Sequence, residues 1–456
     1  MLLSSLDVVV VLPAFSLSHD LALTPADHWT SVTFYFCFKF DMKHPMQTRH
    51  LRLLQRAGTS LSPCTAHTTL IRYASTKSSN ASAAPSSSTT SSTTLSPSRP
   101  QVIFSGIQPT GVPHLGNYLG ALRQWVHLQN TSPPSTTLLF SIVDLHALTS
   151  HQPPASRLAS RRSLLASFLA IGLDPNRCTL FHQSAVPAHS ELHWILSCDA
   201  SMGWLSRMTQ WKSKLSEEDL SALLSPTPNP KQRERMKLGL FSYPVLQAAD
   251  ILVHRATHVP VGEDQLQHIE FARNCAAQFN HTFGGGDEGE GKGKREILVP
   301  PEFVVSPARR VMSLTEPEKK MSKSHELARS RIMLDDSAEE IAKKLKVALT
   351  DSVAGVSYDR AGRPGVSNLI ETMSHLDPES RSIEQIVQSM QGSSLRVLKE
   401  EVTRVVVEHL KPIREEYLRL MGEKNTRLEE IAQEGAEKAR KSAEATMKLV
   451  REAVGL

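Results

Sequence analysis

The fold is indicated by the stretch VIFSGIQPTGVPHLGNYLGALRQWVHL, residues 102–128. It begins with an apolar run over 102–107 that is typical of a buried strand, passes through a loop rich in Pro and Gly, and becomes helical from about Gly116. Apolar runs at 138–143 and 179–182 repeat the strand pattern, with a helical stretch over 158–169 between them. Strands that alternate with helices pair in parallel through right-handed crossovers, so the sequence predicts an α/β fold with a doubly wound parallel sheet.

Polar residues follow the first two predicted strands. Gln108, His114 and Asn117 come after the first strand, and His146 comes after the second. Ligands of doubly wound sheets bind beyond the carboxyl ends of the strands, so these are candidate site residues. A helix that begins near His114 offers free N–H groups and a positive dipole end that suit phosphate, and Gly116 allows a nucleotide to approach the backbone.

The composition is that of a globular chain. Its 456 residues are 40% apolar and 21% charged, a length that allows two or three domains of ~100–200 residues each. No apolar window reaches the ~18 residues of a membrane-spanning helix, which excludes such a helix. The cysteines are odd in number and widely spaced, which favours a reducing compartment over a disulfide framework or a zinc site: Cys37, Cys64, Cys178, Cys198 and Cys275.

The basic residues are concentrated near the N-terminus. The net charge of +5, too small to imply a nucleic-acid partner, divides into −3 for residues 1–41, +7 for 42–100 and +1 for the remainder. Residues 42–78 contain Arg but no acid and are rich in Ser, Thr and Leu, which predicts a mitochondrial transit peptide. Residues 79–100 should be a disordered Ser/Thr-rich linker. Residues 1–41 fit neither pattern, and we expect the natural start at Met42 or Met46, with 1–41 a gene-model extension or disordered.

The C-terminal third lacks strand patterns. Ser337 and Glu340 form a capping box that should open a helix, and apolar residues recur at helical spacing over 395–420 and 428–454. We therefore expect two domains, an α/β domain over 101–334 with a Gly-rich surface insertion at 283–296, and an all-helical domain over 335–456.

The residues at the start of the helix predicted near His114, PHLGN (113–117), form a first motif, and a second motif, KMSKS, spans Lys320 to Ser324. Two lysines three residues apart in a Ser-containing loop can bind a polyphosphate. A charge run such as 318–320 is more often a solvated face, but the whole string is rare.

The two motifs together resemble the signature pair of class I aminoacyl-tRNA synthetases. The wider contexts FSGIQPTG (104–111), VDLHALT (143–149), YPVLQAADIL (243–252) and VPVGEDQ (259–265) resemble the tryptophanyl branch in bacteria and organelles, from about residue 102 to the C-terminus. The resemblance implies a Rossmann-like catalytic domain, a helical anticodon-binding domain and a homodimer. It also implies that L-tryptophan is activated with ATP and Mg²⁺ and transferred to tRNA(Trp). Together with the predicted transit peptide, the resemblance implies an enzyme of the mitochondrial matrix that is not bound to a membrane.

The resemblance also assigns the ATP site. His114, Gly116 and Asn117 would hold phosphates, while the loop of Lys320, Met321, Ser322, Lys323 and Ser324 would close over them. Lys320 and Lys323 would stabilise the leaving diphosphate, and Lys214 would lie near the phosphates. Lys320, Lys323, Lys214 and Gln108 are thus the expected catalytic residues, with Gly262 and Asp264 beside the adenosine. No residue is expected to be a dedicated metal ligand.

Tryptophan recognition is assigned in the same way. The indole N–H only donates, so a buried acceptor should read it, and Asp250 matches the family's indole-reading residue. The alternative is an Asp on a helix surface. Tyr243, Gln265 and Gln108 would contact the ammonium and carboxylate, and His146 and Phe104 would line the pocket. Gln247 replaces a Met that is common in bacterial relatives.

Partner contacts are less well marked in the sequence. Residues 189–211 correspond to the family's dimer contact, with Trp194, Met202, Trp204 and Met208, although ordinary core residues are the alternative. Lys438, Arg440 and Lys441 could meet tRNA phosphates. Two other functions stay open at this point: a tyrosyl-tRNA synthetase, and a non-catalytic paralogue that binds tryptophan or RNA.

Overall fold

The computed structural model describes residues 99–212, 237–262, 265–285, 295–305, 310–422 and 426–456. Every described helix and strand belongs to one compact unit that ends at Leu456. The predicted transit peptide, nearly all of the linker, Lys214, Asp264 and most of the 283–296 insertion lie outside the described residues. Within the described ranges, no helix is both long and apolar enough to span a bilayer.

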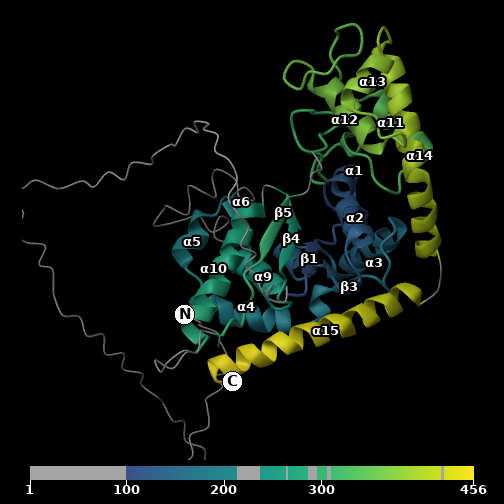
Figure 1. Ribbon diagram of the computed structural model, residues 1–456. Coiled ribbons are helices and arrows are strands. Elements are labelled where there is room, and N and C mark those ends of the chain that lie inside the picture. The colour runs from purple at the N-terminus through teal and green to yellow at the C-terminus, as the bar shows by residue number, and fades with distance from the viewer. Residues whose placement is uncertain (1–98, 213–236, 263–264, 286–294, 306–309, 423–425) are drawn as a thin grey trace, which may run out of the picture. The chain divides into compact units, whose positions relative to one another are not determined.

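A five-stranded parallel sheet forms the centre of this unit, in the order β3-β2-β1-β4-β5 (Figure 1). All four strand pairs are parallel, and each β1 residue pairs with a β2 residue, from Val102 opposite Thr137 to Ile107 opposite Ile142. The predicted α/β, Rossmann-like fold is therefore confirmed. The strands are β1 (Val102–Ile107), β2 (Thr137–Ile142), β3 (Thr179–His182), β4 (His258–Val261) and β5 (Glu302–Val305).

Helices make each crossover between the strands. The first crossover is α1 (Leu115–Asn117), a π-helical turn η1 (Tyr118–Leu122) and α2 (Arg123–Thr131); the second is η2 (His146–Thr149) and α3 (Pro154–Ala170). The longest contains η3 (Gln183–Ala185), α4 (Ala188–Asp199), α5 (Met202–Arg207), α6 (Thr209–Lys212) and α9 (Leu238–Leu252); α10 (Leu266–Phe283) leads to β5. The helices predicted from Gly116 and over 158–169 are present.

Side-chain alternation along the strands divides the core into two layers. Ile103 and Phe140 point into a cluster with the first two crossovers, where Phe140 stacks on Trp125 at a centroid distance of 4.6 Å. Phe104 and Phe181 point the opposite way, into a cluster with α4, α9 and α10. The sheet is thus buried on both faces, as its nearly continuous apolar strands require.

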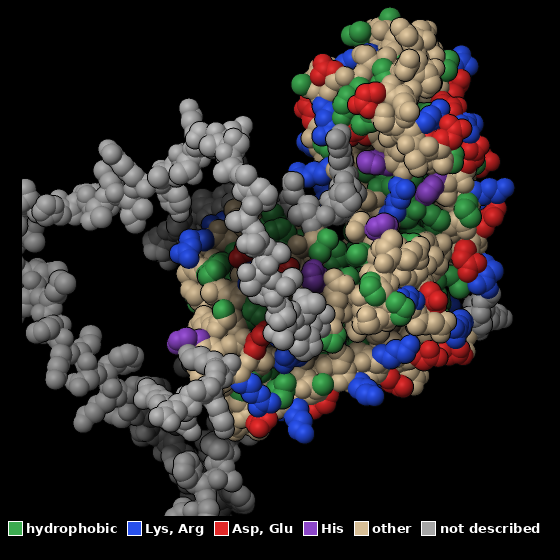
Figure 2. Space-filling model, viewed as in Figure 1, with side chains coloured by type: hydrophobic (Ala, Val, Ile, Leu, Met, Phe, Trp, Pro, Cys, Tyr) green, Lys and Arg blue, Asp and Glu red, His purple; other side chains and the backbone are tan. Residues whose placement is uncertain are grey.

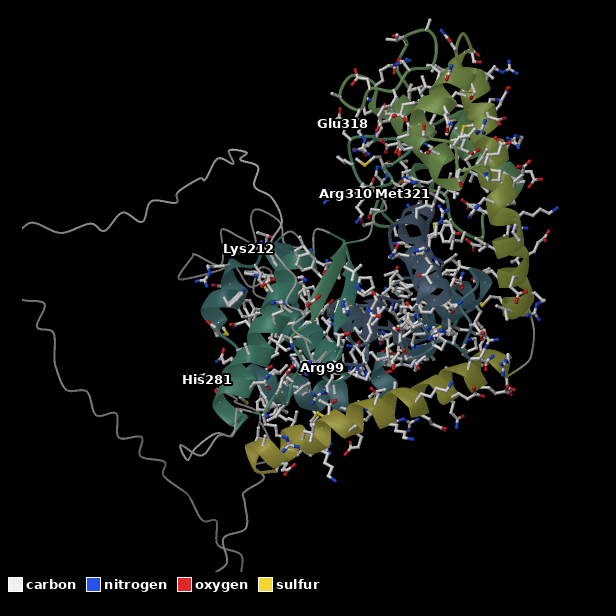
Figure 3. All side chains as sticks on the ribbon, in the orientation of Figure 1. Arg99, Lys212, His281, Arg310, Glu318 and Met321 are labelled. Atoms are coloured by element: carbon white, nitrogen blue, oxygen red, sulfur yellow. The ribbon has the colours of Figure 1, made fainter. Side chains whose placement is uncertain are left out.

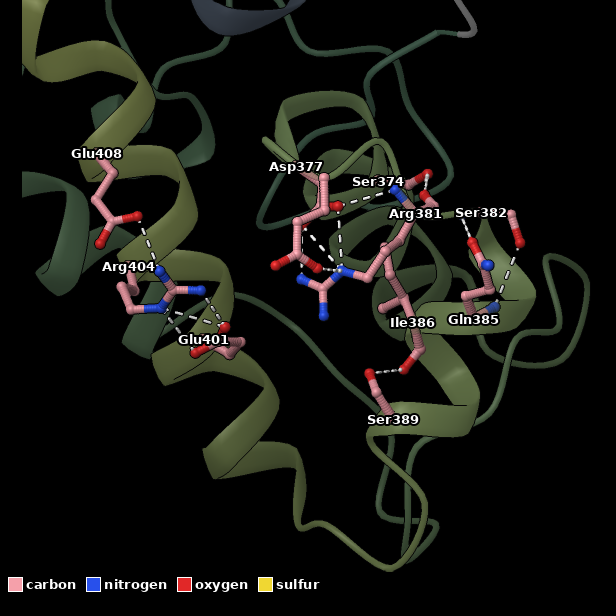
Figure 4. A network of polar contacts seen from close by, with 11 residues as sticks. Ser374, Asp377, Arg381, Ser382, Gln385, Ile386, Ser389, Glu401, Arg404 and Glu408 are labelled. Carbon is pink, nitrogen blue, oxygen red and sulfur yellow. Dashed lines mark hydrogen bonds and ion pairs between the residues drawn. The ribbon is translucent and has the colours of Figure 1, made fainter.

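The C-terminal elements are helical, as predicted. Ser337 caps α11, with Glu340 completing the capping box. Ion pairs occupy several basic side chains here: Arg404 lies between Glu401 and Glu408, and Arg381 binds Asp377 (Figure 4). The helices are α11 (Ala338–Lys346), α12 (Pro364–Leu376), α13 (Ile383–Ser389), α14 (Leu395–Gly422) and α15 (Arg427–Val454), after a short turn η5 (Ala328–Ser330).

The last helix returns to the sheet. Helix α15 packs against β3 and α4, and its Ala439, Ala443 and Met447 are buried in the same cluster as Phe104 (Figure 1). The approach is closest at Gly435, where a Cβ would come within 1.8 Å of the Leu180 carbonyl oxygen. Because β3 is an edge strand, α15 covers backbone that would otherwise be open to pairing.

Candidate active site

A cavity of about 380 Å³ opens where the strand order reverses, beyond the carboxyl ends of β1 and β4. This is the place where doubly wound sheets bind their ligands, and the volume suits a small molecule. The end of β1, the end of β4, the first crossover and α9 all contribute to the lining. It includes every residue predicted to bind tryptophan, together with Gly262 and Lys320: Phe104, Gln108, His146, Tyr243, Gln247, Asp250 and Gln265.

Among the described residues, Asp250 is the one carboxylate that lines the cavity, and it is only 2% exposed. Its Oδ1 accepts hydrogen bonds from Gln183 Nε2 and His189 Nδ1, both at 2.7 Å, and its Oδ2 contacts His146 Nε2 at 2.9 Å. Burial alone would raise the pKa of Asp250, but the hydrogen bonds from His146 and His189 outweigh it and hold the pKa well below its usual range. The buried carboxylate is therefore ionised, and the alternative of a surface Asp is wrong.

The sequence did not single out Gln183 or His189. Gln183 follows β3 directly, so the strand-end rule that selected His146 would have found it too. His189 lies on α4, 61 residues before Asp250, and no local spacing links the two.

Amide and imidazole groups form the cavity wall beside Asp250. The Tyr243 hydroxyl contacts His268 Nε2 at 3.3 Å, and His268 Nδ1 contacts Gln265 Oε1 at 2.9 Å. Gln265 Nε2 donates to Gln210 Oε1 at 3.1 Å, and Gln247 Nε2 donates to Gln265 Oε1 at 3.4 Å. The wall therefore presents both donors and acceptors, which suits a zwitterionic ligand with an ammonium and a carboxylate.

The first motif forms a reciprocal cap. His114 Nδ1 accepts from the Asn117 N–H and Asn117 Oδ1 accepts from the His114 N–H, both at 3.2 Å. Burial, and then the charges of Lys323, Lys320 and Arg331, lower the pKa of His114 to about 4. His114 is therefore neutral near pH 7, and because Nδ1 is an acceptor, its proton lies on Nε2.

The second motif lies directly against the first. A Cβ on Gly116 would come within 3.0 Å of the His114 ring and 3.5 Å of the Met321 Cβ, and Met321 is buried beside α1 (Figure 3). The Leu115 N–H also donates to the Ile332 carbonyl at 2.8 Å. Two motifs about 200 residues apart in sequence are thus in contact, and the small size of Gly116 leaves room for the neighbouring His114 ring.

The two motif lysines lie in different environments. Lys323 Nζ donates to the carbonyls of Thr110 and Gly111 and to the Thr110 hydroxyl, each at 3.1 Å. Burial lowers the pKa of Lys323 to about 8, with Arg331 acting in the same direction and Asp335 against it. Lys320 is exposed at the cavity rim. The other predicted ATP-site residues among the described ones do not line this cavity: His114, Gly116, Asn117, Met321, Ser322, Lys323 and Ser324.

The residues expected at partner contacts divide by exposure. Trp194 and Met202 are 69% and 66% exposed, whereas Met208 is buried in the core. On α15, Lys438 Nζ donates to the Pro175 carbonyl at 3.3 Å and Arg440 Nε to the Ala436 carbonyl at 3.2 Å. Lys and Arg side chains are interspersed with Asp and Glu on the face seen in Figure 2.

Comparisons with known proteins point to one family. Residues 96–411 match the family model described as tRNA synthetases class I (W and Y). The chain is 42% identical over 356 residues to the mitochondrial tryptophan–tRNA ligase of Schizosaccharomyces pombe, covering 78% of this chain and 95% of that one. It is 42% identical over 356 residues to the tryptophan–tRNA ligase of Rickettsia conorii, covering 78% and 98%.

Solved structures agree with these relatives. Tryptophanyl-tRNA synthetase from Mycoplasma pneumoniae superimposes with a TM-score of 0.66 at 30% identity, over 78% of this chain and 98% of that chain. The Campylobacter jejuni enzyme, complexed with ADP and tryptophan, gives a TM-score of 0.61 at 32% identity over 78% and 100%.

Proposed function

The chain belongs to the class I tRNA synthetase family for tryptophan and tyrosine and acts as a tryptophan–tRNA ligase, and we propose that the cavity beside Asp250 performs this reaction in mitochondria. In the first step a carboxylate oxygen of L-tryptophan attacks the α-phosphorus of ATP, forming tryptophanyl-AMP and releasing diphosphate. In the second, a terminal hydroxyl of tRNA(Trp) attacks the acyl carbon, forming the ester and releasing AMP.

The observation that carries the tryptophan assignment is the hydrogen bonding of Asp250. A carboxylate oxygen accepts about two hydrogen bonds, so Oδ1 is saturated by Gln183 and His189. Oδ2 accepts from His146 alone among the described residues, which leaves one acceptor position. The indole N–H is a donor of matching kind, and we propose that it binds Asp250 Oδ2. Phe104 and His146 would then flank the indole, with Gln247 at its rim.

The polar wall opposite would hold the amino-acid end. We propose that Gln108, Tyr243 and Gln265 orient the ammonium and carboxylate, so that the nucleophilic oxygen faces the nucleotide. The reaction needs little covalent chemistry from the protein, since positioning and charge stabilisation supply most of the catalysis.

The two motifs would bind ATP. His114 can donate from Nε2 and Asn117 from its side-chain amide, because the cap uses the His114 Nδ1 and the Asn117 Oδ1. Lys320 at the cavity rim and Lys323 would stabilise the charge that builds on the departing diphosphate. Gly262 borders the cavity and would lie near the adenosine, together with Asp264. Met321, Ser322 and Ser324 shape the loop that bears the lysines. Lys214 is proposed to act beside them.

Mg²⁺ is proposed to accompany ATP. Among the described residues, no group of three or more His, Cys, Asp or Glu side chains could hold a metal ion. The triphosphate oxygens are the ligands that Mg²⁺ usually takes in such sites.

Tryptophan-dependent exchange of diphosphate into ATP tests the proposal, with tyrosine as the competing amino acid and tRNA(Trp) charging as the second step. Lys320→Ala should lower the exchange rate by about 10²–10³-fold, the scale of one lost donor to developing charge. Lys319→Ala is the matched control, because Lys319 is a neighbouring exposed lysine that pairs with Glu316. Equal activity of both variants, or exchange that tyrosine supports as well, would contradict the assignment.

We propose that the enzyme is a homodimer, with the exposed side chains of Trp194 and Met202 at the contact. Trp194→Glu should yield a monomer in analytical ultracentrifugation. Leu158→Glu should not, because Leu158 is an equally exposed apolar residue on α3. A dimeric Trp194→Glu enzyme would place the contact elsewhere.

Residues 335–456 are proposed to carry the anticodon-binding surface, and 42–78 the mitochondrial address. A fluorescent protein fused to 42–78 should enter the mitochondrial matrix. The same fusion with Arg52→Glu and Arg56→Glu should stay outside, since import depends on the cationic face.

A further inference from the structure

A chain of buried hydrogen bonds leads away from the cavity behind Asp250. His189 Nδ1 contacts Asp250 Oδ1 at 2.7 Å, and His189 Nε2 contacts His254 Nε2 at 3.3 Å. His254 Nδ1 then contacts Ser442 Oγ at 3.2 Å. The chain joins α9, α4, the turn after α9 and α15, so it links the candidate tryptophan site to the C-terminal helix.

None of the three residues behind Asp250 lines the cavity, and the proposed reaction uses none of them. His189 is 0% exposed and His254 3%, whereas Ser442 is partly exposed on α15. His254 stacks on Phe104 at a ring distance of 5.7 Å and meets Phe181 edge-on at 5.6 Å. Two polar rings are therefore buried in an apolar layer, a costly arrangement unless every ring nitrogen is paired.

The positions of the protons in this chain of hydrogen bonds can be assigned by starting at Asp250. Asp250 is ionised and can only accept, so His189 donates from Nδ1. The contact between His189 Nε2 and His254 Nε2 needs one proton, and we assign it to His254, which leaves His189 Nε2 as the acceptor. His254 Nδ1 then accepts the Ser442 O–H. Burial lowers the pKa of His254 well below its usual value, which agrees with a single ring proton.

This ordering holds the Asp250 carboxylate in one orientation toward the ligand. His189 and Gln183 together saturate Oδ1, so the carboxylate cannot rotate without breaking both contacts. His189 can keep its own orientation only while His254 donates to its far nitrogen, and His254 is oriented in turn by Ser442. A fixed Oδ1 leaves Oδ2 as the acceptor presented to the cavity.

We propose that His189, His254 and Ser442 are positioning residues that aim Asp250 at the indole N–H, so that α15 contributes to tryptophan specificity. The inference rests on the proposed role of Asp250 as the indole acceptor. It assigns a substrate-selecting role to a serine that is 192 positions further along the chain from Asp250 and does not touch the cavity.

The test compares tryptophan with 3-benzothienylalanine, in which sulfur replaces the indole N–H. The measured quantity is the ratio of kcat/KM for the two substrates in diphosphate exchange by the full chain. Damage to folding or to ATP binding lowers both values together, whereas a misaimed Asp250 lowers the value for tryptophan alone.

Four variants test the individual hydrogen bonds between Asp250, His189, His254 and Ser442. His254→Phe keeps a ring between Phe104 and Phe181 but removes both nitrogens, and it should lower the ratio by about two- to tenfold, the value of one net hydrogen bond. His254→Gln places an amide donor where Nε2 lies and should restore most of the ratio. His189→Asn keeps the donor to Asp250 but loses the contact with His254, and should resemble His254→Phe. Ser442→Ala should lower the ratio by about twofold, at the low end of the same range.

Two controls complete the design. Thr446→Ala removes a buried side chain one turn further along α15 and should lower Tm without changing the ratio. The double variant His254→Phe/Ser442→Ala should be no worse than His254→Phe alone, because the residues act in series.

The outcomes distinguish this inference from the proposed function. If Asp250→Asn leaves the ratio unchanged, Asp250 does not read the indole and the proposed role fails. If Asp250→Asn lowers the ratio but His254→Phe and Ser442→Ala do not, only the positioning role of His189, His254 and Ser442 is refuted. A ratio that falls in His254→Phe, recovers in His254→Gln and is unaffected by Thr446→Ala supports it.

Discussion

Replacing Asp250 by Asn changes one atom of the buried carboxylate and keeps its shape. The structure specifies what the amide can satisfy. Gln183 and His189 both donate to the Oδ1 position, so the Asn oxygen must lie there. The amide nitrogen then takes the Oδ2 position, where His146 can adapt by accepting at Nε2. An indole N–H at that position would meet a donor instead of an acceptor.

The size of the effect follows from that mismatch. A buried donor left without a partner costs about 1–3 kcal/mol, and a bond to a charged acceptor is about twice as strong as a neutral one. At about 1.4 kcal/mol per tenfold change, kcat/KM for tryptophan should fall by ~10²-fold. Because 3-benzothienylalanine lacks the N–H, its kcat/KM should change by less than about threefold.

Diphosphate exchange at saturating ATP gives both constants, and a thermal melt of the same preparation reports folding. A parallel loss for both substrates would mean that Asp250 stabilises the fold of the site and not the indole. An unchanged kcat/KM for tryptophan would remove Asp250 from substrate recognition altogether.

Three further changes test other contacts. Burial lowers the pKa of Lys323 to about 8, so near pH 8 about half of this lysine is neutral. ATP binding should restore its charge, and calorimetry in two buffers should then detect the uptake of up to about half a proton. The Lys323→Met variant should show no such proton uptake. The uptake should vanish by pH 6.5, where the lysine is already charged, and its persistence there would implicate another group. Gly116→Ala should raise KM for ATP by about tenfold without changing KM for tryptophan, as its Cβ lies 3.0 Å from the His114 ring; equal effects on both constants would contradict a local clash. Gly435→Ala should lower Tm by several degrees, because the new Cβ would lie 1.8 Å from the Leu180 carbonyl oxygen and would force α15 away from β3. Such overpacking costs about 1–3 kcal/mol. An unchanged Tm would show that α15 does not pack closely against β3 at this position.

The first three strands were predictable because each is a continuous apolar run followed by a polar residue. Strands β4 and β5 were not predicted, since each has four residues and β4 contains Pro260. A proline argues against an interior strand, yet β4 lies between β1 and β5. Its pairing with β1 is confined to Ile103 opposite His258, before the proline is reached.

The candidate site was predictable where its residues follow strand ends or form motifs. That rule placed Gln108 and His146 at the cavity, and the motif contexts placed Tyr243 and Asp250 there. It could not find His254, whose partners lie 65 residues before it and 188 after it. Such a chain of contacts forms only when α4, α9 and α15 pack together, so no periodicity in the sequence predicts it.

The proposed role of Asp250 requires a charged residue to select a neutral ring, and the hydrogen bonds of the carboxylate suit that role. An ionised carboxylate with four acceptor positions would attract any donor, including a lysine or a water cluster, and would discriminate poorly. Here three positions are taken by Gln183, His189 and His146, so the carboxylate offers one direction of acceptance instead of a diffuse negative charge. A substrate without a donor at that point, such as phenylalanine, leaves a buried acceptor unpaired, which is how a polar site rejects an analogue that fits by shape. If Asp250 binds the indole as proposed, selection for tryptophan depends as much on the three side chains that hydrogen-bond to Asp250 as on Asp250 itself.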